Sequence, residues 1–234
     1  MNASVGMLSD YDEALGEFDD VCRQLDSCLC VVDGIDHRRR HEVANLAHDI
    51  VSAAAGLRSA HEHASHAIQA QELRLSLFGP GLLGSTDEAD DSGRRLRMAY
   101  KQMFVLIRAY QDALCRVLLI LAGQAAGKGT SMKTAMNKPG NPCGDSAKTV
   151  EGYEAWFEDW REKRNAVKDG VSFSLAGPGS NVGISFSRVN GETGGIVIDC
   201  QDAVRLLDAA RAIAMSTKLT RIAKARAEES ARSL

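Results

Sequence analysis

Apolar residues recur every three or four positions along most of the first 123 residues, and this helical period is the feature that most limits the fold. The pattern predicts three long helices, over about 9–33, 36–77 and 94–123. Gly and Pro interrupt it at 79–81, where a helix does not continue easily. The third helix is the most apolar, and we expect it to be central in a helical bundle.

The pattern changes after residue 123. Residues 124–145 are rich in Gly, Lys, Ser, Thr and Pro, which predicts a long mobile loop. Helical spacing then resumes near Ser146 and continues to Asp169, which predicts a fourth long helix of the bundle.

The last part of the chain mixes two periods. Apolar and polar residues alternate within 171–187, and the turn signal Asn190-Gly191 follows, which predicts a small antiparallel β-hairpin element of two or three strands. Asp202 then begins a C-terminal helix. The predicted fold class is therefore mostly α: a bundle of four long helices over 1–170, and over 171–234 the β-hairpin and the C-terminal helix packed on it.

Charge is distributed unevenly over a chain with a net charge of −3. Residues 1–36 carry nine acids and one base, whereas residues 201–234 carry seven Lys or Arg and four acids. We expect these two segments to meet, within one chain or between two chains. The six cysteines lack paired C-x-x-C spacing, which predicts buried free thiols.

Nothing in the sequence predicts contact with a membrane. The acidic N-terminal segment lacks the basic and apolar regions of a signal peptide. The longest apolar run, 117–122, is too short to span a bilayer. The expected location is therefore the cytoplasm.

Both tryptophans and the densest group of charged side chains lie within residues 156–170. On a helix, Tyr153, Phe157 and Trp160 share one face, and Arg164 continues it. Basic residues near a helix C-terminus complement the helix dipole and need no other role. Burying an unpaired charge is costly, so the alternative is that these cations contact a carboxylate or a bound phosphate.

The sequence Arg164-Asn165-x-x-Lys168-Asp169 resembles the signature of the HEPN superfamily (higher eukaryotes and prokaryotes nucleotide-binding). In that family an arginine, usually followed by a polar residue such as asparagine, precedes a histidine after four to six intervening residues. Arg164 and Asn165 match the first two positions. Asp169 stands where the histidine could fall, and no histidine follows His66.

The resemblance implies a helical bundle that forms a homodimer and acts on RNA, in a bacterial defence or toxin–antitoxin setting. Active members resemble metal-independent endoribonucleases, so the implied catalytic residues are Arg164, Asn165 and Asp169. Arg164 would stabilise the charged phosphate, Asn165 would orient Arg164 or the ribose 2′-hydroxyl, and Lys168 and Arg161 would bind flanking phosphates. Aspartate gives up a proton near neutral pH only if its pKa is raised strongly. The expected function is therefore RNA binding or weak cleavage, without a metal ion or cofactor.

Two other segments carry candidate ligands. Lys128 lies in a Gly-rich segment that lacks the spacing of a P-loop, and we expect a basic loop that contacts phosphates. Four histidines share the polar face of the second helix, where a solvated face is expected; replacement of the missing motif histidine is the alternative. No third ligand accompanies them, so no metal site is predicted. The four are His37, His41, His48 and His66.

The alternative function is that of a dimerising helical scaffold or interaction protein with no role in nucleic-acid binding. In that hypothesis Arg164 pairs with acidic residues such as Asp12 or Glu17. The two hypotheses differ in what an Arg164→Ala change does. RNA affinity falls in the first, whereas stability falls by a few kcal/mol in the second, as when one partner of a buried pair is removed.

Overall fold

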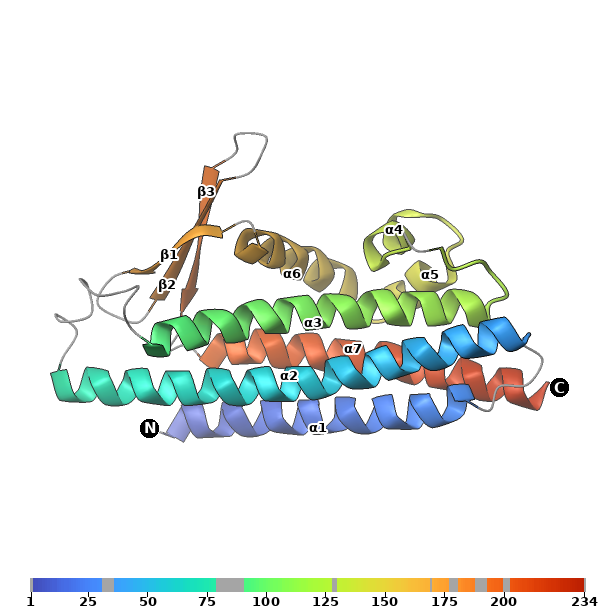
Figure 1. The fold of residues 1–234 in the computed structure, drawn as a ribbon, viewed down its shortest axis with the longest axis horizontal. Helices are drawn as coiled ribbons and strands as arrows, with labels where there is room; N and C mark the ends of the chain where they lie inside the picture. The colour runs from blue at the N-terminus through green and yellow to red at the C-terminus, as the bar shows by residue number, and fades with distance from the viewer. Residues whose placement is uncertain are drawn as a thin grey trace.

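A computed structural model of the chain describes residues 2–30, 36–78, 91–127, 130–168, 170–176, 181–187, 193–199 and 203–233. Four long helices lie side by side along the molecule (Figure 1). They are α1 (Asn2–Cys30), α2 (His37–Phe78), α3 (Asp91–Leu121) and α7 (Ala203–Arg232). A shorter helix, α6 (Tyr153–Lys168), packs on α3.

The predicted fold class is wrong about which helices form the bundle. The sequence placed the tryptophan-bearing helix fourth, whereas α7, a helix of 30 residues, takes that place and packs on α1. α6 has 16 residues and lies outside the four long helices (Figure 1). A long helix buries its apolar stripe along the whole length of its neighbours, which a helix of half that length cannot do.

The predicted β-hairpin is not confirmed. All residues whose side chains the structure describes lie in helices or in the turns between them. Within residues 170–176, 181–187 and 193–199 the backbone follows three antiparallel strands in the order β1-β2-β3, the larger of the two strand numbers expected, so the element is a sheet and not a single hairpin. These strands are β1 (Gly170–Ala176), β2 (Asn181–Ser187) and β3 (Thr193–Asp199). Three alternating runs reach strand length here, so a hairpin would leave one run unpaired.

The strands stand next to α6 at one end of the molecule (Figure 1). In their register, Val182 of β2 pairs with Leu175 of β1 and with Ile198 of β3. The sheet contacts α6 through β2 and β3. α1 and α7 pack against each other elsewhere in the molecule.

The described residues 130–148 between α3 and α6 are folded, so the prediction of a mobile loop over 124–145 is wrong for this part. They contain the short helices α4 (Met132–Asn137) and α5 (Pro142–Lys148). The side chains of Ser131 and Asn141 accept backbone N–H groups in their first turns and cap the two helices. Each helix buries a small apolar face. The buried apolar residues are Met132, Ala135, Met136, Cys143 and Ala147.

Tyr110 joins three of the long helices in the core. Its hydroxyl donates to the Ser216 carbonyl oxygen of α7 at 2.5 Å and lies 2.9 Å from Thr220 Oγ1. Its ring meets that of Phe18 of α1 edge to face, with centroids 4.8 Å apart. The buried hydroxyl is therefore satisfied within the bundle.

The acidic N-terminal segment and the basic C-terminal segment meet within one chain, as one of the two expected arrangements. α7 lies along α1 (Figure 1), and Arg221 forms an ion pair with Glu17. Lys224 Nζ also donates to Gln24 Oε1 at 2.6 Å. Glu17, one of the acids expected to pair with Arg164, is thus paired with α7.

Candidate functional site

The face of α6 that packs on α3 is aromatic, as its spacing predicted. Tyr153, Phe157 and Trp160 are buried, and the Trp160 ring lies 4.1 Å, centroid to centroid, from Phe104 of α3. Burial of these rings fixes the rotation of α6 about its own axis. Arg164, one turn further along, therefore also faces α3.

α3 supplies a cation and a carboxylate one turn apart. Arg108 Nε lies 3.1 Å from Oδ2 of Asp112, and the Arg108 side chain is 17% exposed. The Arg108 guanidinium carbon lies 5.7 Å from the centre of the Phe157 ring, which is a cation–π contact. Arg108 is thus held by a carboxylate and by an aromatic ring from the neighbouring helix.

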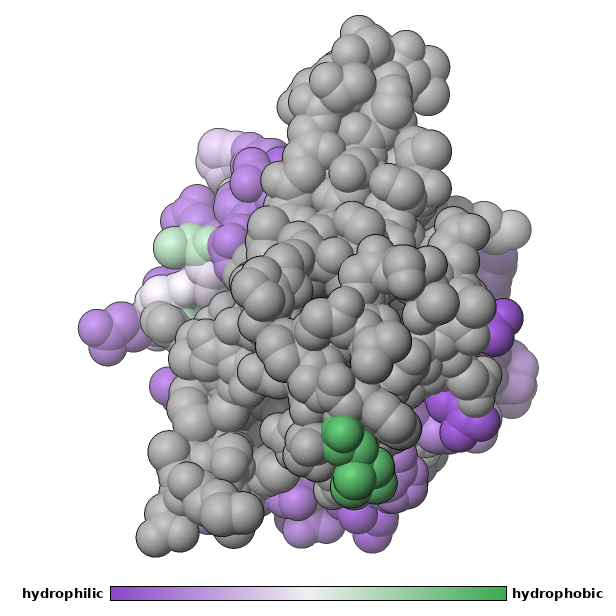
Figure 2. Space-filling model, turned by 90° about the vertical axis from the view of Figure 1, so that its left-hand side faces the viewer, coloured by the Kyte–Doolittle hydropathy of each residue, from purple (hydrophilic) through white to green (hydrophobic). Residues whose placement is uncertain are grey.

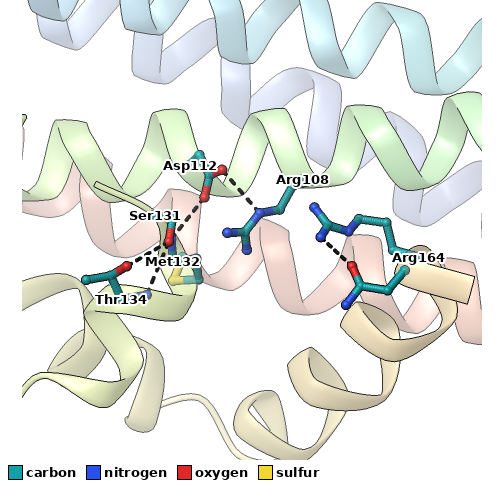
Figure 3. Close-up of polar contacts among 7 residues, drawn as sticks. Arg108, Asp112, Ser131, Met132, Thr134 and Arg164 are labelled. Carbon is teal, nitrogen blue, oxygen red and sulfur yellow. Dashed lines mark hydrogen bonds and ion pairs between the residues drawn. The ribbon is translucent and has the colours of Figure 1, made fainter. Parts of the chain in front are cut away.

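The N-terminus of α4 holds the other oxygen of the same carboxylate. Asp112 Oδ1 accepts the Met132 N–H at 2.9 Å. Ser131 fixes that end of α4, because its Oγ accepts the Thr134 N–H at 3.2 Å (Figure 3). Both oxygens of Asp112 therefore have donors, and the carboxylate is fixed between α3 and α4.

Arg164 extends from α6 toward Arg108 of α3. Figure 3 shows its guanidinium beside that of Arg108, on the side away from Asp112. Arg164 Nη2 donates to Asn165 Oδ1 at 2.5 Å, and both residues are half-buried. The two residues singled out from the sequence thus lie together, and α3 adds a second guanidinium.

Burial raises the pKa of the Asp112 carboxyl above its ordinary value. The hydrogen bond from Met132 and the positive charges of Arg108 and Arg164 only partly offset this rise. Arg164 therefore acts on Asp112 electrostatically although it belongs to another helix. The positive charges of Arg108 and Arg164 therefore both act on the single carboxylate of Asp112.

Several buried donors around α6 have no acceptor in the part of the protein that the structure describes. They include Arg108 Nη1, the Tyr153 hydroxyl and the indole N–H groups of Trp156 and Trp160. Leaving a buried polar group unpaired costs about 1–3 kcal/mol, and more if it is charged. Arg108 Nη1 is the charged member of this group, and an oxygen-rich anion would supply its missing acceptor.

The other predicted site residues are either paired elsewhere or lack a described side chain. Arg161 pairs with Glu158 of the same helix at 2.6 Å. Lys168 ends α6, and its side chain is outside the described part. Asp169 and Lys128 lie outside the described residues altogether. The candidate site therefore consists of Arg164 and Asn165 with residues that the sequence analysis did not single out.

Those additional residues are Arg108 and Asp112. A signal for them was present, because they are opposite charges four residues apart in a long helix that was expected to be central in the bundle. Charges in such a helix must find partners at a helix contact or in solvent. The spacing of these two residues does not indicate which neighbouring helix supplies the contact.

The histidines lie elsewhere. His37, His41, His48 and His66 are exposed on α2, which packs against α1 and α3. A solvated polar face, the expected arrangement, accounts for them. Among the described residues, no group of three or more His, Cys, Asp or Glu side chains could hold a metal ion.

Comparison of the chain with protein-family models, with curated proteins and with solved structures gave no match. The resemblance to the HEPN superfamily therefore stays a prediction that rests on Arg164 and Asn165. Within the described ranges, no helix combines the length and the apolar character needed to cross a membrane.

Proposed function

We propose that the protein binds phosphate groups of RNA at the site formed by Arg108 and Arg164. The observation that supports this most is the meeting of two guanidiniums, from α3 and α6, beside a single carboxylate. Arg108 Nη1 also lacks an acceptor among the described residues. A guanidinium donates two parallel hydrogen bonds to phosphate, which makes arginine the usual residue for this contact. RNA is the ligand class that the Arg164-Asn165 resemblance implies.

The site is better suited to binding than to cleavage. Strand cleavage needs a group that gives or takes a proton near neutral pH. Arginine and asparagine do not titrate there. Both oxygens of Asp112 already accept from Arg108 and Met132, so neither is directed at a ligand. We therefore propose a positioning role for Asp112, which holds Arg108 in place, and a binding role for the protein.

Replacing Arg164 with alanine is expected to weaken the binding of a short single-stranded RNA about tenfold. A hydrogen bond to a charged group contributes about 1.5–3 kcal/mol, and the half-exposed position of Arg164 places the effect at the lower end. Fluorescence anisotropy at low salt measures the affinity, because phosphate contacts weaken steeply as salt rises. The matched control is Arg161→Ala, which removes the same charge one turn earlier, where the arginine pairs with Glu158.

The outcomes separate the hypotheses. An equal loss of affinity in both variants would trace binding to net charge and would refute this site. Unchanged affinity in a folded Arg164→Ala protein would refute the RNA-binding proposal. End-labelled RNA incubated in EDTA tests cleavage: products from the parent protein, absent with Arg164→Ala, would identify a metal-independent endoribonuclease instead.

A second candidate function, that of a dimerising scaffold, is favoured by exposed apolar side chains on α2 and α3. Leu73 and Leu77 lie one turn apart on α2, and Met98 and Val105 lie two turns apart on α3; each is at least 61% exposed. Figure 2 shows an end of the molecule where the coloured side chains are mostly hydrophilic and one strongly hydrophobic spot is exposed. Exposed apolar side chains on a helix suit a helix contact with a second copy.

Val105→Glu is expected to convert a dimer to a monomer if the exposed face of α3 is the contact. A buried carboxylate without a partner disfavours association strongly. Sedimentation equilibrium would then give twice the 25.2 kDa chain mass for the parent protein and the chain mass for the variant. Ala225→Glu, at an exposed position of α7, serves as the control. A monomeric parent protein would exclude this second function.

A further inference from the structure

The beginning of α2 is basic and exposed on every side. It consists of residues 37–41, with the sequence His-Arg-Arg-Arg-His, which we call the basic turn. All five residues are exposed, and the first buried residue of α2 is Val43. A helix that packs along its length buries about every third or fourth residue. The basic turn therefore contributes nothing to the core, and core packing does not explain its composition.

The two acids that flank the basic turn in sequence are both in ion pairs. Asp36 Oδ2 lies 3.6 Å from Arg39 Nε, and Glu42 Oε1 accepts from Arg116 Nη2 of α3 at 2.7 Å. Three arginines therefore stand beside two acids, and α3 holds one of these acids. Positive charge at this end of a helix is also disfavoured by the helix dipole. A ligand that carries several negative charges would offset both effects.

A row of residues on α3 connects the basic turn to the proposed phosphate site. Arg108, Asp112 and Arg116 are spaced four residues apart, so they follow one side of α3. The side chains of Asp112 and Arg116 are 33% and 28% exposed, so solvent reaches this side of the helix. Arg116 contacts α2 through Glu42, the residue that directly follows the basic turn. The row therefore leads from the site to the basic turn along accessible surface.

The length of this surface matches a short strand of RNA. Arg116 follows Arg108 by about 12 Å along α3, and Arg38 precedes Glu42 by about 6 Å along α2. The two helices run in opposite directions (Figure 1), so the second step continues the first. The basic turn thus lies about 18 Å from Arg108 along the bundle. A stacked strand advances about 3.4 Å per nucleotide, so about six nucleotides cover this length.

We propose that the basic turn binds the phosphate backbone of the same RNA strand that binds at Arg108 and Arg164. The inference rests on the function proposed above and specifies its ligand, a single strand of about six nucleotides or more. Guanidinium groups bind phosphates at both ends of the surface, and the strand lies along α3 between them. Phosphate contacts position a strand and carry no sequence information. The length of the RNA therefore affects binding more than its sequence does.

The test compares uridine oligonucleotides of three, six, nine and twelve nucleotides by fluorescence anisotropy at low salt. In the double variant Arg38→Ala/Arg39→Ala, we expect RNA of nine or twelve nucleotides to bind about tenfold more weakly than in the parent protein. RNA of three nucleotides is too short to reach both places and should bind equally well. The plot of log affinity against log salt concentration should become less steep by about 1.4, because each phosphate contact to a single strand contributes about 0.7.

The matched control is the double variant Arg94→Ala/Arg95→Ala. These two adjacent arginines are also exposed near the start of a helix, but α3 begins at the end of the molecule opposite to the start of α2 (Figure 1). An equal loss of affinity in the control would trace the effect to net charge and overturn the inference. Unchanged affinity of Arg38→Ala/Arg39→Ala for the longest RNA would overturn it too, as would an equal loss for three and for twelve nucleotides.

Failure of this inference can be told apart from failure of the proposed function. Arg164→Ala should weaken binding at every length, whereas Arg38→Ala/Arg39→Ala should act only on the longer RNA. If Arg164→Ala weakened binding and the basic-turn variant did not, the phosphate site would stand and the second contact would be refuted. A parent protein that binds none of the four RNA lengths would refute both. Circular dichroism checks that each variant is folded.

Discussion

Replacing Phe157 with alanine is expected to lower the free energy of unfolding by about 3–5 kcal/mol. The ring is 1% exposed, stacks with Tyr153 at 6.1 Å and lies under the Arg108 guanidinium. Truncation leaves a cavity between α3 and α6 and removes the cation–π contact. Urea unfolding followed by far-ultraviolet circular dichroism measures the change, since the nearby tryptophans would complicate a fluorescence signal.

Glu162→Ala is the control for this prediction. Glu162 is exposed on the same helix, and surface substitutions of this kind stay within about 0.5 kcal/mol of the parent protein. A Phe157→Ala protein as stable as Glu162→Ala would mean that α6 does not pack on α3 through this face. In that case Arg164 would not be held beside Arg108, and the binding site proposed here would be lost as well.

The long helices could be predicted because apolar residues recur at helical spacing within each of them. α2 begins within one residue of the predicted position, and Asp36 caps it as expected, with its Oδ1 accepting the Arg39 N–H at 3.0 Å. The aromatic face of α6 was predictable for the same reason. Spacing of three and four residues places Tyr153, Phe157 and Trp160 on one side whatever the helix packs against.

The short helices could not be predicted from the spacing of apolar residues. α4 and α5 span two turns or fewer, so neither repeats an apolar pattern often enough to be distinguished from a loop. Their stability comes from caps and from burial against α3, and only the caps are local. Ser131 and the Asn141-Pro142 pair were the available signals, because these residues favour the first positions of a helix.

Two of the four residues of the candidate site could be predicted from the sequence. Arg164 and Asn165 are neighbours in sequence, so a motif can include them both. Arg108 and Asp112 precede them by more than fifty residues, and only the packing of α6 on α3 brings the two guanidiniums together. A contact between distant segments depends on which faces meet, and the period of one helix does not specify its neighbour.

Gly144→Ala is expected to lower the free energy of unfolding by about 1–2 kcal/mol. A Cβ at this position would stand 2.3 Å from the Ala135 carbonyl oxygen and 2.8 Å from its carbon. These are backbone atoms, so α4 would have to move away from α5, and overpacking of this kind costs about 1–3 kcal/mol. The higher helix propensity of alanine offsets less than 1 kcal/mol of this loss. Thermal and urea unfolding would measure the difference.

Gly16→Ala makes the same chemical change where it should have the opposite sign. Gly16 lies inside α1, and a Cβ there would meet nothing within 4 Å. The gain in helix propensity is then uncompensated, and we expect about 0.5–1 kcal/mol of added stability. If both variants were stabilised, α4 and α5 could separate at no cost. Asp112 depends on α4 through the Met132 N–H, so its carboxylate would then lose the fixed position that holds Arg108.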